Sequence, residues 1–334
     1  MFMKHISLVY LLFFYSQFII ANNDLLPSWT DGPTKSAILH FVEETTQKDH
    51  PHYIPVEERI ATFDQDGTLW VEQPLNTQLF FAIDHIKLFA PQHPDWKEKE
   101  PFKTILMHDV AGLKAFDERE IEQIIAVTHA NMTVHEYKKA VQEWLQKAIH
   151  PHFKKPFTEL VYQPMLEVIQ LLQKHGFKTY IVSGSGQEFI RAYAEKIYGI
   201  PPEHVIGSAS KVKYIYQNDC PALLKLSELL FVDDKAGKPE AISLIIGRRP
   251  FAAFGNSIGD REMLEWTQAG CGKRLALLVY HNDAIREYAY GPNSKIGTFS
   301  FALMEEAKKR GWLVVSMKDD WKMIFAWESP CKLP

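Results

Sequence analysis

Residues 59–70 of the chain read RIATFDQDGTLW, where a strand-like apolar segment leads directly into two carboxylates, a glycine and a hydroxyl. A carboxylate at the carboxyl end of a buried strand can act as a nucleophile, and a second one two residues later can exchange protons with a leaving group and with water. Asp64 and Asp66 have this spacing. Gly67 allows the chain to turn sharply after them, and Thr68 can direct its hydroxyl at phosphoryl oxygens. The stretch therefore predicts a site of covalent phosphate transfer.

An ordinary acidic turn after a strand is the alternative interpretation of the same residues, because Asp-Gly is a common turn dipeptide. The organisation of the rest of the chain has to decide between them.

From residue 157 onward, helix-like and strand-like segments alternate. Helices are expected over 164–175, 187–198, 238–246 and 258–266, and strands over 178–182, 251–254, 275–280 and 312–315. This alternation predicts an α/β fold with a parallel sheet, in which ligand sites lie beyond the carboxyl ends of the strands. Residues 205–217 depart from the alternation and resemble a hairpin.

Residues 76–148 have a helical hydrophobic pattern that no convincing strand interrupts. Thr133 and Glu136 fit a capping box at the start of the last of these helices, and Asp117 with Glu120 resembles one for the helix before it. We therefore expect a helical unit inserted after the first motif. The other interpretation makes these helices ordinary layers of a single core.

Composition places the chain among globular proteins that bind small molecules. Of its 334 residues, 46% are hydrophobic and 13% are aromatic, which is enough for a substantial core. The net charge of -4, from 37 basic and 41 acidic residues, provides no electrostatic footprint for nucleic acid or an anionic membrane. Three cysteines, Cys220, Cys271 and Cys331, show no metal-ligand spacing.

The amino terminus has the pattern of a secretory signal. Lys4 and His5 precede an apolar run over residues 6–20, and Ala21 offers a small residue for cleavage. The run is shorter than the ~20 residues that a spanning helix needs. We therefore expect a signal peptide over residues 1–21, export to a bacterial periplasm or out of the cell, and no stable membrane insertion after cleavage. An uncleaved membrane anchor is the alternative.

Ser183 ends the expected strand 178–182 and is followed by Gly184, Ser185 and Gly186. Such glycines let the backbone approach a phosphate at the start of the next helix, where free N–H groups favour anions. A dinucleotide fingerprint is excluded because Phe189 occupies its third glycine position.

Asn256 and Asp260 follow the expected strand 251–254 and are oxygen donors of the kind that Mg²⁺ prefers. Between these segments, a lysine at the start of the expected helix 238–246 can offset negative charge on a nucleophile and on a phosphoryl group. Lys238 is the first candidate, and Lys235 is the alternate.

Taken in order, these four segments resemble the four motifs of the haloacid dehalogenase superfamily, and more narrowly those of its phosphoserine-phosphatase-like phosphatases. The resemblance covers residues 61–260, and four ordered motifs are much more specific than any single one. It implies a Rossmann-like core, with helices on both faces of the sheet, and a Mg²⁺-dependent phosphomonoesterase activity. It also implies an all-helical C1-type cap after the first motif, which matches residues 75–149, with residues 22–74 and 150–334 forming the catalytic core.

The resemblance implies that Asp64 is the nucleophile and Asp66 the general acid and base. The substrate phosphate would be bound by Thr68, Ser183, Gly184 and Lys238.

Mg²⁺ would be held by the Asp64 carboxylate, the Asp66 backbone carbonyl and the segment of Asn256 and Asp260. Family members usually carry an acid where Asn256 stands, so either Asn256 or Asp260 could contact the ion directly.

The second carboxylate favours a phosphatase, since the dehalogenases of the superfamily lack an acid there and its ion-pumping ATPases carry a threonine. The expected partner is a small phosphomonoester. Phosphotransfer to an alcohol acceptor and a secreted phosphate-ligand-binding protein without turnover are the alternative functions.

Four aromatic residues could line a pocket for a cationic headgroup or pack as core, and helical spacing favours core. They are Trp70, Phe80, Phe81 and Trp144.

Overall fold

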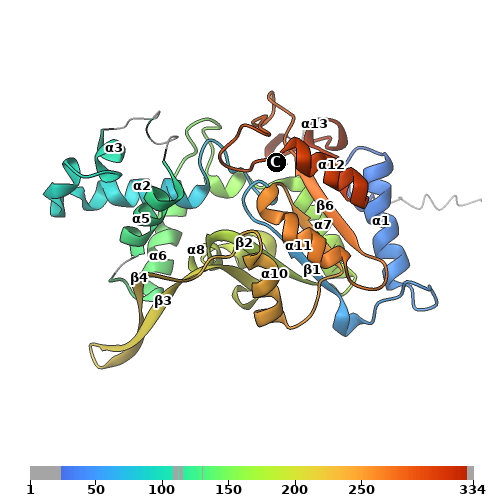
Figure 1. The fold of residues 1–334 in the computed structure, drawn as a ribbon, viewed down its shortest axis with the longest axis horizontal. Coiled ribbons are helices and arrows are strands. Elements are labelled where there is room, and N and C mark those ends of the chain that lie inside the picture. The colour runs from blue at the N-terminus through green and yellow to red at the C-terminus, as the bar shows by residue number, and fades with distance from the viewer. Residues whose placement is uncertain (1–23, 108–111, 113–115, 130, 329–334) are drawn as a thin grey trace, which may run out of the picture.

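The computed structural model describes residues 24–107, 112, 116–129 and 131–328 (Figure 1). The predicted signal peptide and Cys331 lie outside the described residues. Cys220 and Cys271 are exposed and unpaired. Within the described part of the chain, no helix has the length and apolar character needed to cross a membrane.

A seven-stranded sheet forms the centre of the molecule, with the order β4-β3-β2-β1-β5-β6-β7. All neighbouring strands are parallel except β3 and β4, which are antiparallel. The strands are β1 Ile60–Phe63, β2 Lys178–Gly186, β3 Val205–Gln217, β4 Cys220–Phe231, β5 Ala252–Gly255, β6 Leu275–Tyr280 and β7 Leu313–Ser316. The predicted α/β fold with a Rossmann-like parallel sheet is confirmed.

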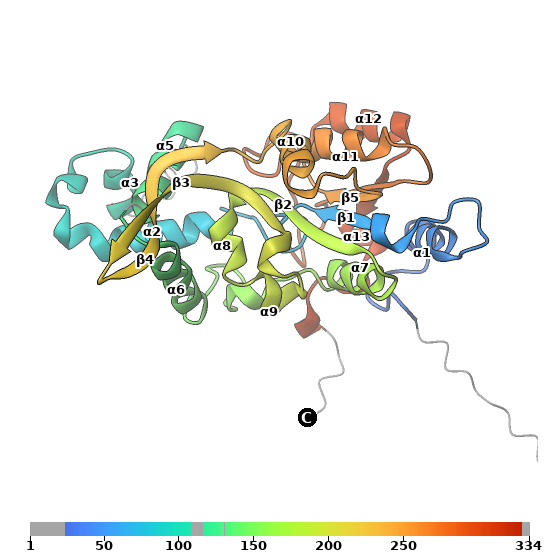
Figure 2. The same ribbon diagram turned by 90° about the horizontal axis from the view of Figure 1, so that it is seen from below.

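Helices cover both faces of this sheet (Figure 2). One side carries α1 Pro33–Thr46, α7 Gln163–Lys174, α8 Gln187–Arg191 and α9 Ala194–Tyr198, and the other carries α10 Gly237–Ala241, α11 Arg261–Gln268 and α12 Phe301–Arg310. The short helix α13 Met317–Asp320 follows β7. Successive strand residues point into different cores, as Ile181 and Val182 do. Burial on both faces explains why β1 is apolar and buried throughout.

The segment between β1 and β2 is helical, with no strand among its described residues between 76 and 148. It contains α2 Thr77–Phe89, α3 Phe102–Leu106, α5 Glu118–His129 and α6 Val134–Leu145. Helices α2, α3 and α5 share an apolar cluster of their own, which includes Leu79, Ile83 and Ile124. The buried residues of α6 belong instead to the core on one face of the sheet. The predicted capping box of Thr133 and Glu136 is confirmed, and Asp117 and Glu120 exchange the corresponding hydrogen bonds.

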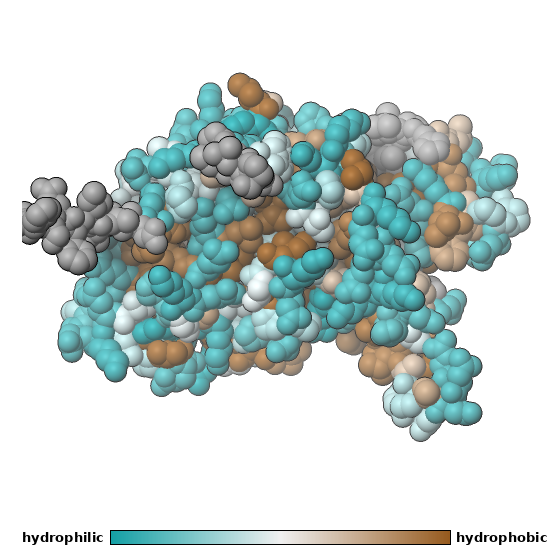
Figure 3. Space-filling model, turned by 180° about the vertical axis from the view of Figure 1, so that it is seen from behind, coloured by the Kyte–Doolittle hydropathy of each residue, from teal (hydrophilic) through white to brown (hydrophobic). Residues whose placement is uncertain are grey.

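The hairpin is longer than the sequence indicates. Residues 205–217 form the single strand β3, which pairs with β4 over a long antiparallel register. The prediction of a hairpin within 205–217 was therefore wrong about its extent, because the turn lies later, at Asn218 and Asp219, which both have positive φ. Such residues tolerate this conformation better than most. The hairpin protrudes from the body of the molecule (Figure 3).

Other boundaries also shift. Strand β2 continues to Gly186 because β3 pairs with Ser183 and Gly186 around an irregularity in the register. The expected helix 187–198 is divided into α8 and α9, and the expected helix 238–246 becomes α10 followed by a π-helical turn over Ile242–Ile246. A 3₁₀ turn, Ile258–Asp260, precedes α11.

Candidate active site

The candidate catalytic residues meet at the carboxyl edge of the central strands. Asp64 follows β1 and Asn256 follows β5, and these strands are parallel neighbours. The backbone N–H of Asp64 donates to the carbonyl of Phe254 at 2.9 Å, which continues the pairing to the end of both strands. Because parallel strands end at the same edge of a sheet, residues separated by 192 positions along the chain become neighbours.

Lys238 is the centre of this group. Its ammonium donates to Asp64 Oδ1 at 2.7 Å, to Asp260 Oδ1 at 2.5 Å and to the carbonyl of Val182 at 3.0 Å. The side chain is only 2% exposed. Lys235, the alternate candidate, has a side chain that is 56% exposed and pairs weakly with Asp234 at 3.8 Å. The structure thus brings Lys238, and not Lys235, to the predicted nucleophile.

Burial and charge determine the ionisation of this group. Burial raises the pKa of Asp64 well above its ordinary range, the charge of Asp260 adds to this, and the ammonium of Lys238 opposes it. Burial alone would lower the pKa of Lys238, but the charges of Asp260 and Asp64 outweigh it and the pKa rises. Lys238 therefore stays charged and is the main group that opposes the rise in the pKa of Asp64.

Asp66 is held by two donors. Its Oδ1 accepts from the indole Nε1 of Trp70 at 2.8 Å, and its Oδ2 accepts from the hydroxyl of Ser185 at 2.5 Å. Burial raises its pKa, and these two hydrogen bonds partly reverse the shift. A carboxyl group with a raised pKa is suited to carrying a proton near neutral pH. The role of Ser185 was not predicted, although its two-residue spacing from Ser183 places both on the same face of β2.

Ser183 and Gly184 lie where the sequence predicts, on β2 near the site. Ser183 is 1% exposed, and its hydroxyl oxygen accepts from the backbone N–H of Ser185 at 3.3 Å. The carbonyl of Gly184 accepts from the hydroxyl of Ser208 at 2.7 Å. Thr68 is fully buried, and its hydroxyl donates to Asn256 Oδ1 at 3.4 Å.

A further buried carboxylate, Glu72, lies beside Asn256 and was not predicted. Its Oε1 accepts from Asn256 Nδ2 at 2.6 Å and from the hydroxyl of Tyr290 at 2.7 Å. Burial raises the pKa of Glu72 well above its ordinary range. Gly67 has a φ of 73°, and a Cβ at that position would lie 2.0 Å from Asn256 Nδ2 and 2.3 Å from Glu72 Oε1. The glycine is therefore required both for the turn and for the approach of these two side chains.

Comparison with known proteins identifies this arrangement. The family model of the haloacid dehalogenase-like hydrolases matches residues 61–265. The chain belongs to this family. Its matched segment begins within β1 and ends within α11, so it includes every predicted catalytic, phosphate-binding and metal-binding residue, whereas Tyr290 lies beyond it.

Two solved structures with TM-scores above 0.5 share the fold of this haloacid dehalogenase-like hydrolase. A Bordetella pertussis Tohama I protein of unknown function is 14% identical, with a TM-score of 0.51 over 78% of this chain and 99% of that one. A conserved, functionally unknown protein from Anaerococcus prevotii DSM 20548 is also 14% identical, with a TM-score of 0.53 over 84% of this chain and 91% of that one. A phosphoserine phosphohydrolase-like protein from Francisella tularensis subsp. tularensis SCHU S4 is 19% identical, with a TM-score of 0.37 over 66% of this chain and 87% of that one. No curated protein sequence matches the chain.

The donor set of this haloacid dehalogenase-like hydrolase suits Mg²⁺. Buried acidic side chains outnumber the single ammonium of Lys238, so carboxyl oxygens remain that a cation could bind. Asp260 is already fully used, because Oδ1 binds Lys238 while Oδ2 accepts from the backbone N–H groups of Asn256 and Ser257 at 2.9 and 3.1 Å. No cluster of three or more His, Cys, Asp or Glu side chains arranged for a metal occurs among the described residues. Mg²⁺ needs no such cluster, since one or two carboxylates with carbonyl or amide oxygens and water suffice.

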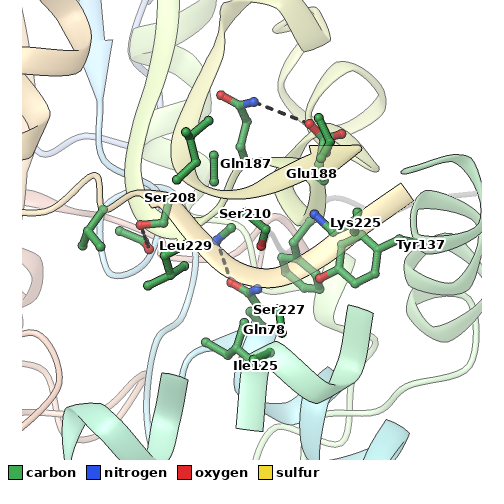
Figure 4. A pocket seen from close by; sticks show the side chains of 18 of the residues that line it. Gln78, Ile125, Tyr137, Gln187, Glu188, Ser208, Ser210, Lys225, Ser227 and Leu229 are labelled. Atoms are coloured by element: carbon green, nitrogen blue, oxygen red, sulfur yellow. Dashed lines mark hydrogen bonds between the residues drawn. The ribbon is translucent and has the colours of Figure 1, made fainter. Parts of the chain in front are cut away.

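A cavity of about 1260 Å³ lies next to this site, between the helical segment and the β3–β4 hairpin (Figure 4). Its lining includes Gly184 and Gly186 from the end of β2, Asp234 from the segment before α10, and Tyr137 and Lys225 from α6 and β4. None of the four aromatic residues considered above lines it. Trp70 and Phe81 are 1% exposed, and Phe80 and Trp144 pack against the core, so the prediction that these rings are core is confirmed.

Proposed function

We propose that the protein is an exported, Mg²⁺-dependent phosphomonoesterase that hydrolyses a small phosphorylated metabolite through an aspartyl-phosphate. The observation that carries the proposal is the buried Lys238 that donates to both Asp64 and Asp260, with the side chain of Asp66 fixed by Ser185. A binding site for phosphate alone requires cations and N–H groups, whereas this one presents a carboxylate nucleophile next to a carboxyl acid.

In the first step, Asp64 Oδ attacks phosphorus and the bond from phosphorus to the ester oxygen breaks. Asp66 gives its proton to the departing alkoxide, so the leaving group departs as a neutral alcohol. The ammonium of Lys238, with the backbone N–H groups near Ser183 and Gly184, lies close to the negative charge on the phosphoryl oxygens. Bound Mg²⁺, held by Asp64, the Asp66 carbonyl and Asn256, would supply further charge neutralisation there.

In the second step, water attacks the phosphorus of the aspartyl-phosphate, and Asp66 accepts the proton of that water. The bond between Asp64 and phosphorus breaks, inorganic phosphate leaves, and both aspartates return to their starting states. The raised pKa of Asp66 supports this double role, because a carboxyl group that titrates closer to neutrality can both donate and accept a proton.

The test uses the mature chain from residue 22 and a panel of phosphomonoesters, assayed for phosphate release with and without Mg²⁺. Phosphate release that requires the ion supports the proposal. Release into an added alcohol, detected as a new phosphate ester, would identify a phosphotransferase. Binding of phosphate esters without turnover of any of them would identify a binding protein. Export is tested separately by fractionation of a bacterial host that expresses the full chain. A cytosolic protein that still carries residues 1–21 would contradict it.

A further inference from the structure

The cavity beside the active site contains a buried lysine whose charge has no anionic partner. Lys225, on β4, is 5% exposed. Among the described residues, no hydrogen bond or ion pair is made by its ammonium, and its nearest partner is the ring of Tyr137, 5.0 Å from Nζ (Figure 4). Burial lowers the pKa of Lys225, and the charge of Glu188 opposes this. Burying an ammonium group without a carboxylate partner destabilises the folded protein, so a buried lysine of this kind calls for a functional explanation.

The carboxylate whose charge acts on this lysine is already engaged. Glu188 Oε1 pairs with Arg191 at 2.9 Å. Arg119 also lines the cavity, so basic side chains outnumber acidic ones on this wall. The cavity is therefore suited to an anion.

The remaining walls are largely apolar. The helical segment contributes Ile121 and Ile125, and the hairpin contributes Leu223 and Leu229. Leu223 and Leu229 are 45% and 42% exposed, which is high for leucines that line a pocket. A ligand with an apolar linker would cover them and gain hydrophobic stabilisation.

The other end of the cavity lies next to the reaction centre, although Asp64, Asp66 and Lys238 are not themselves part of its lining. Gly184 and Gly186 line it, and Ser185 between them donates to Asp66. Gly186 is fixed by its backbone N–H, which donates to Gln78 Oε1 of α2 at 2.7 Å. The predicted acid, Asp66, is thus linked through Ser185 to the segment of β2 that lines the cavity.

We infer that the substrate carries a second acidic group, and that Lys225 binds this group while the phosphate ester lies at Asp64. The inference rests on the proposed function, which places the ester at Asp64. The second group is a carboxylate or another phosphoryl group, joined to the ester by an apolar chain that spans the cavity.

Three matched probes test this inference: hexyl phosphate, the ω-phosphooxy derivative of hexanoate, and hexanediol bisphosphate. The wild-type chain should hydrolyse one or both of the doubly acidic probes with a lower KM than hexyl phosphate. Lys225→Met, which keeps the apolar stem against Tyr137, should raise KM for the preferred probe by about 10- to 100-fold, as expected for loss of a hydrogen bond to a charged group. KM for hexyl phosphate and kcat for every probe should stay unchanged.

Two further variants serve as controls. Lys213→Met removes an exposed lysine from the same hairpin, outside the cavity lining, and should change no constant. Lys225→Arg keeps the charge and should restore part of the selectivity. An equal rise in KM for all probes in Lys225→Met, or no rise at all, would overturn the inference.

A binding measurement separates this inference from the proposed function. Calorimetric titration of the Asp64→Asn variant with hexyl phosphate and the preferred doubly acidic probe should show tighter binding of the latter, and the added Lys225→Met change should remove the difference. If the wild-type chain hydrolyses no ester while this selectivity is present, the proposed function fails and the Lys225 site stands. If the wild-type chain hydrolyses the esters but shows no such selectivity, the proposed function stands and the Lys225 site fails.

Discussion

Two buried lysines show how differently the two halves of this site are built. Lys238 is surrounded by Asp64, Asp260 and a backbone carbonyl, so its charge is balanced by the protein itself. Lys225 lies against an aromatic ring at the wall of a cavity, and no described residue balances its charge. The first arrangement fixes a chemical step, whereas the second leaves a recognition step to be completed by a ligand. The chemical step therefore depends on the carboxyl edge of the sheet. Substrate selectivity depends instead on the cavity wall formed by α5, α6 and the β3–β4 hairpin, which we call the roof.

The largest expected effect belongs to the sheet edge. Asp64→Asn removes the nucleophile but keeps the size of the side chain, so turnover of every phosphomonoester should fall by at least about 10⁴-fold. The unfolding midpoint should not fall, because the substitution removes one of several carboxylates from a crowded buried site. Phosphate release and circular dichroism melting measure the two results. Residual turnover within tenfold of wild type would assign the nucleophile elsewhere.

The next-largest effect is expected at Glu72. This residue places an acidic group beside Asn256, the position where family members usually carry an acid. Glu72 accepts from Asn256 Nδ2, so Asn256 Oδ1 is directed toward the hydroxyl of Thr68, and it is the amide oxygen that would be available to bound Mg²⁺. Glu72→Gln keeps a hydrogen-bonding oxygen but removes the acidic group, and should weaken Mg²⁺ binding by about 10-fold or more, as outer-shell changes do. Calorimetric titration with MgCl₂ in the absence of substrate measures this.

A charge swap supplies the control for that prediction. Asn256→Asp alone places two carboxylates in contact and should lower the unfolding midpoint of the metal-free protein. The double variant Glu72→Gln/Asn256→Asp again has one acidic side chain at positions 72 and 256, and its Mg²⁺ affinity should return to near the wild-type value. A double variant that binds Mg²⁺ no better than Glu72→Gln alone would show that charge at this pair is not what matters.

The catalytic half could be predicted from the sequence because it depends on strand ends. Apolar runs followed by Asp64, Ser183 and Asn256 place these residues at one edge of any parallel sheet that contains them. Glu72 could not be predicted, since it returns to the site only because Gly67 has a left-handed conformation and directs the following residues back past Asn256.

The recognition half could not be predicted for a different reason. Lys225 is one lysine in a strand whose other residues are mostly exposed, which indicates a solvated hairpin. It is buried only because β4 packs against α5 and α6, nearly a hundred residues earlier in the chain, and its backbone N–H donates to the carbonyl of Met132 at 2.9 Å. No local pattern encodes that contact.

A smaller effect is expected on the pH dependence of stability. Asp233 is fully buried beside Lys238, and burial raises its pKa from 3.8 to about 7, although the charge of Lys238 opposes the shift. Because the folded protein holds this proton more tightly than the unfolded chain, stability should fall as the pH rises from about 4 to about 7. Asp233→Asn removes this loss, so its unfolding midpoint should exceed that of wild type at pH 8 but not at pH 4. Equal differences at both pH values would contradict the assignment.

The smallest expected effect lies in the roof and tests whether the two halves are independent. Thr133 caps α6 and also forms a bridge with Leu224, the residue before Lys225. Thr133→Ala should destabilise the protein by about 1 kcal/mol through loss of the cap, as measured by urea unfolding, and should raise KM only for the doubly acidic probe because the hairpin is less well fixed. Turnover of hexyl phosphate should be unaffected, since no contact joins Thr133 to Asp64, Asp66 or Lys238 among the described hydrogen bonds. A fall in kcat for hexyl phosphate would mean that the roof also positions the catalytic residues, and that the separation between chemistry and recognition is incomplete.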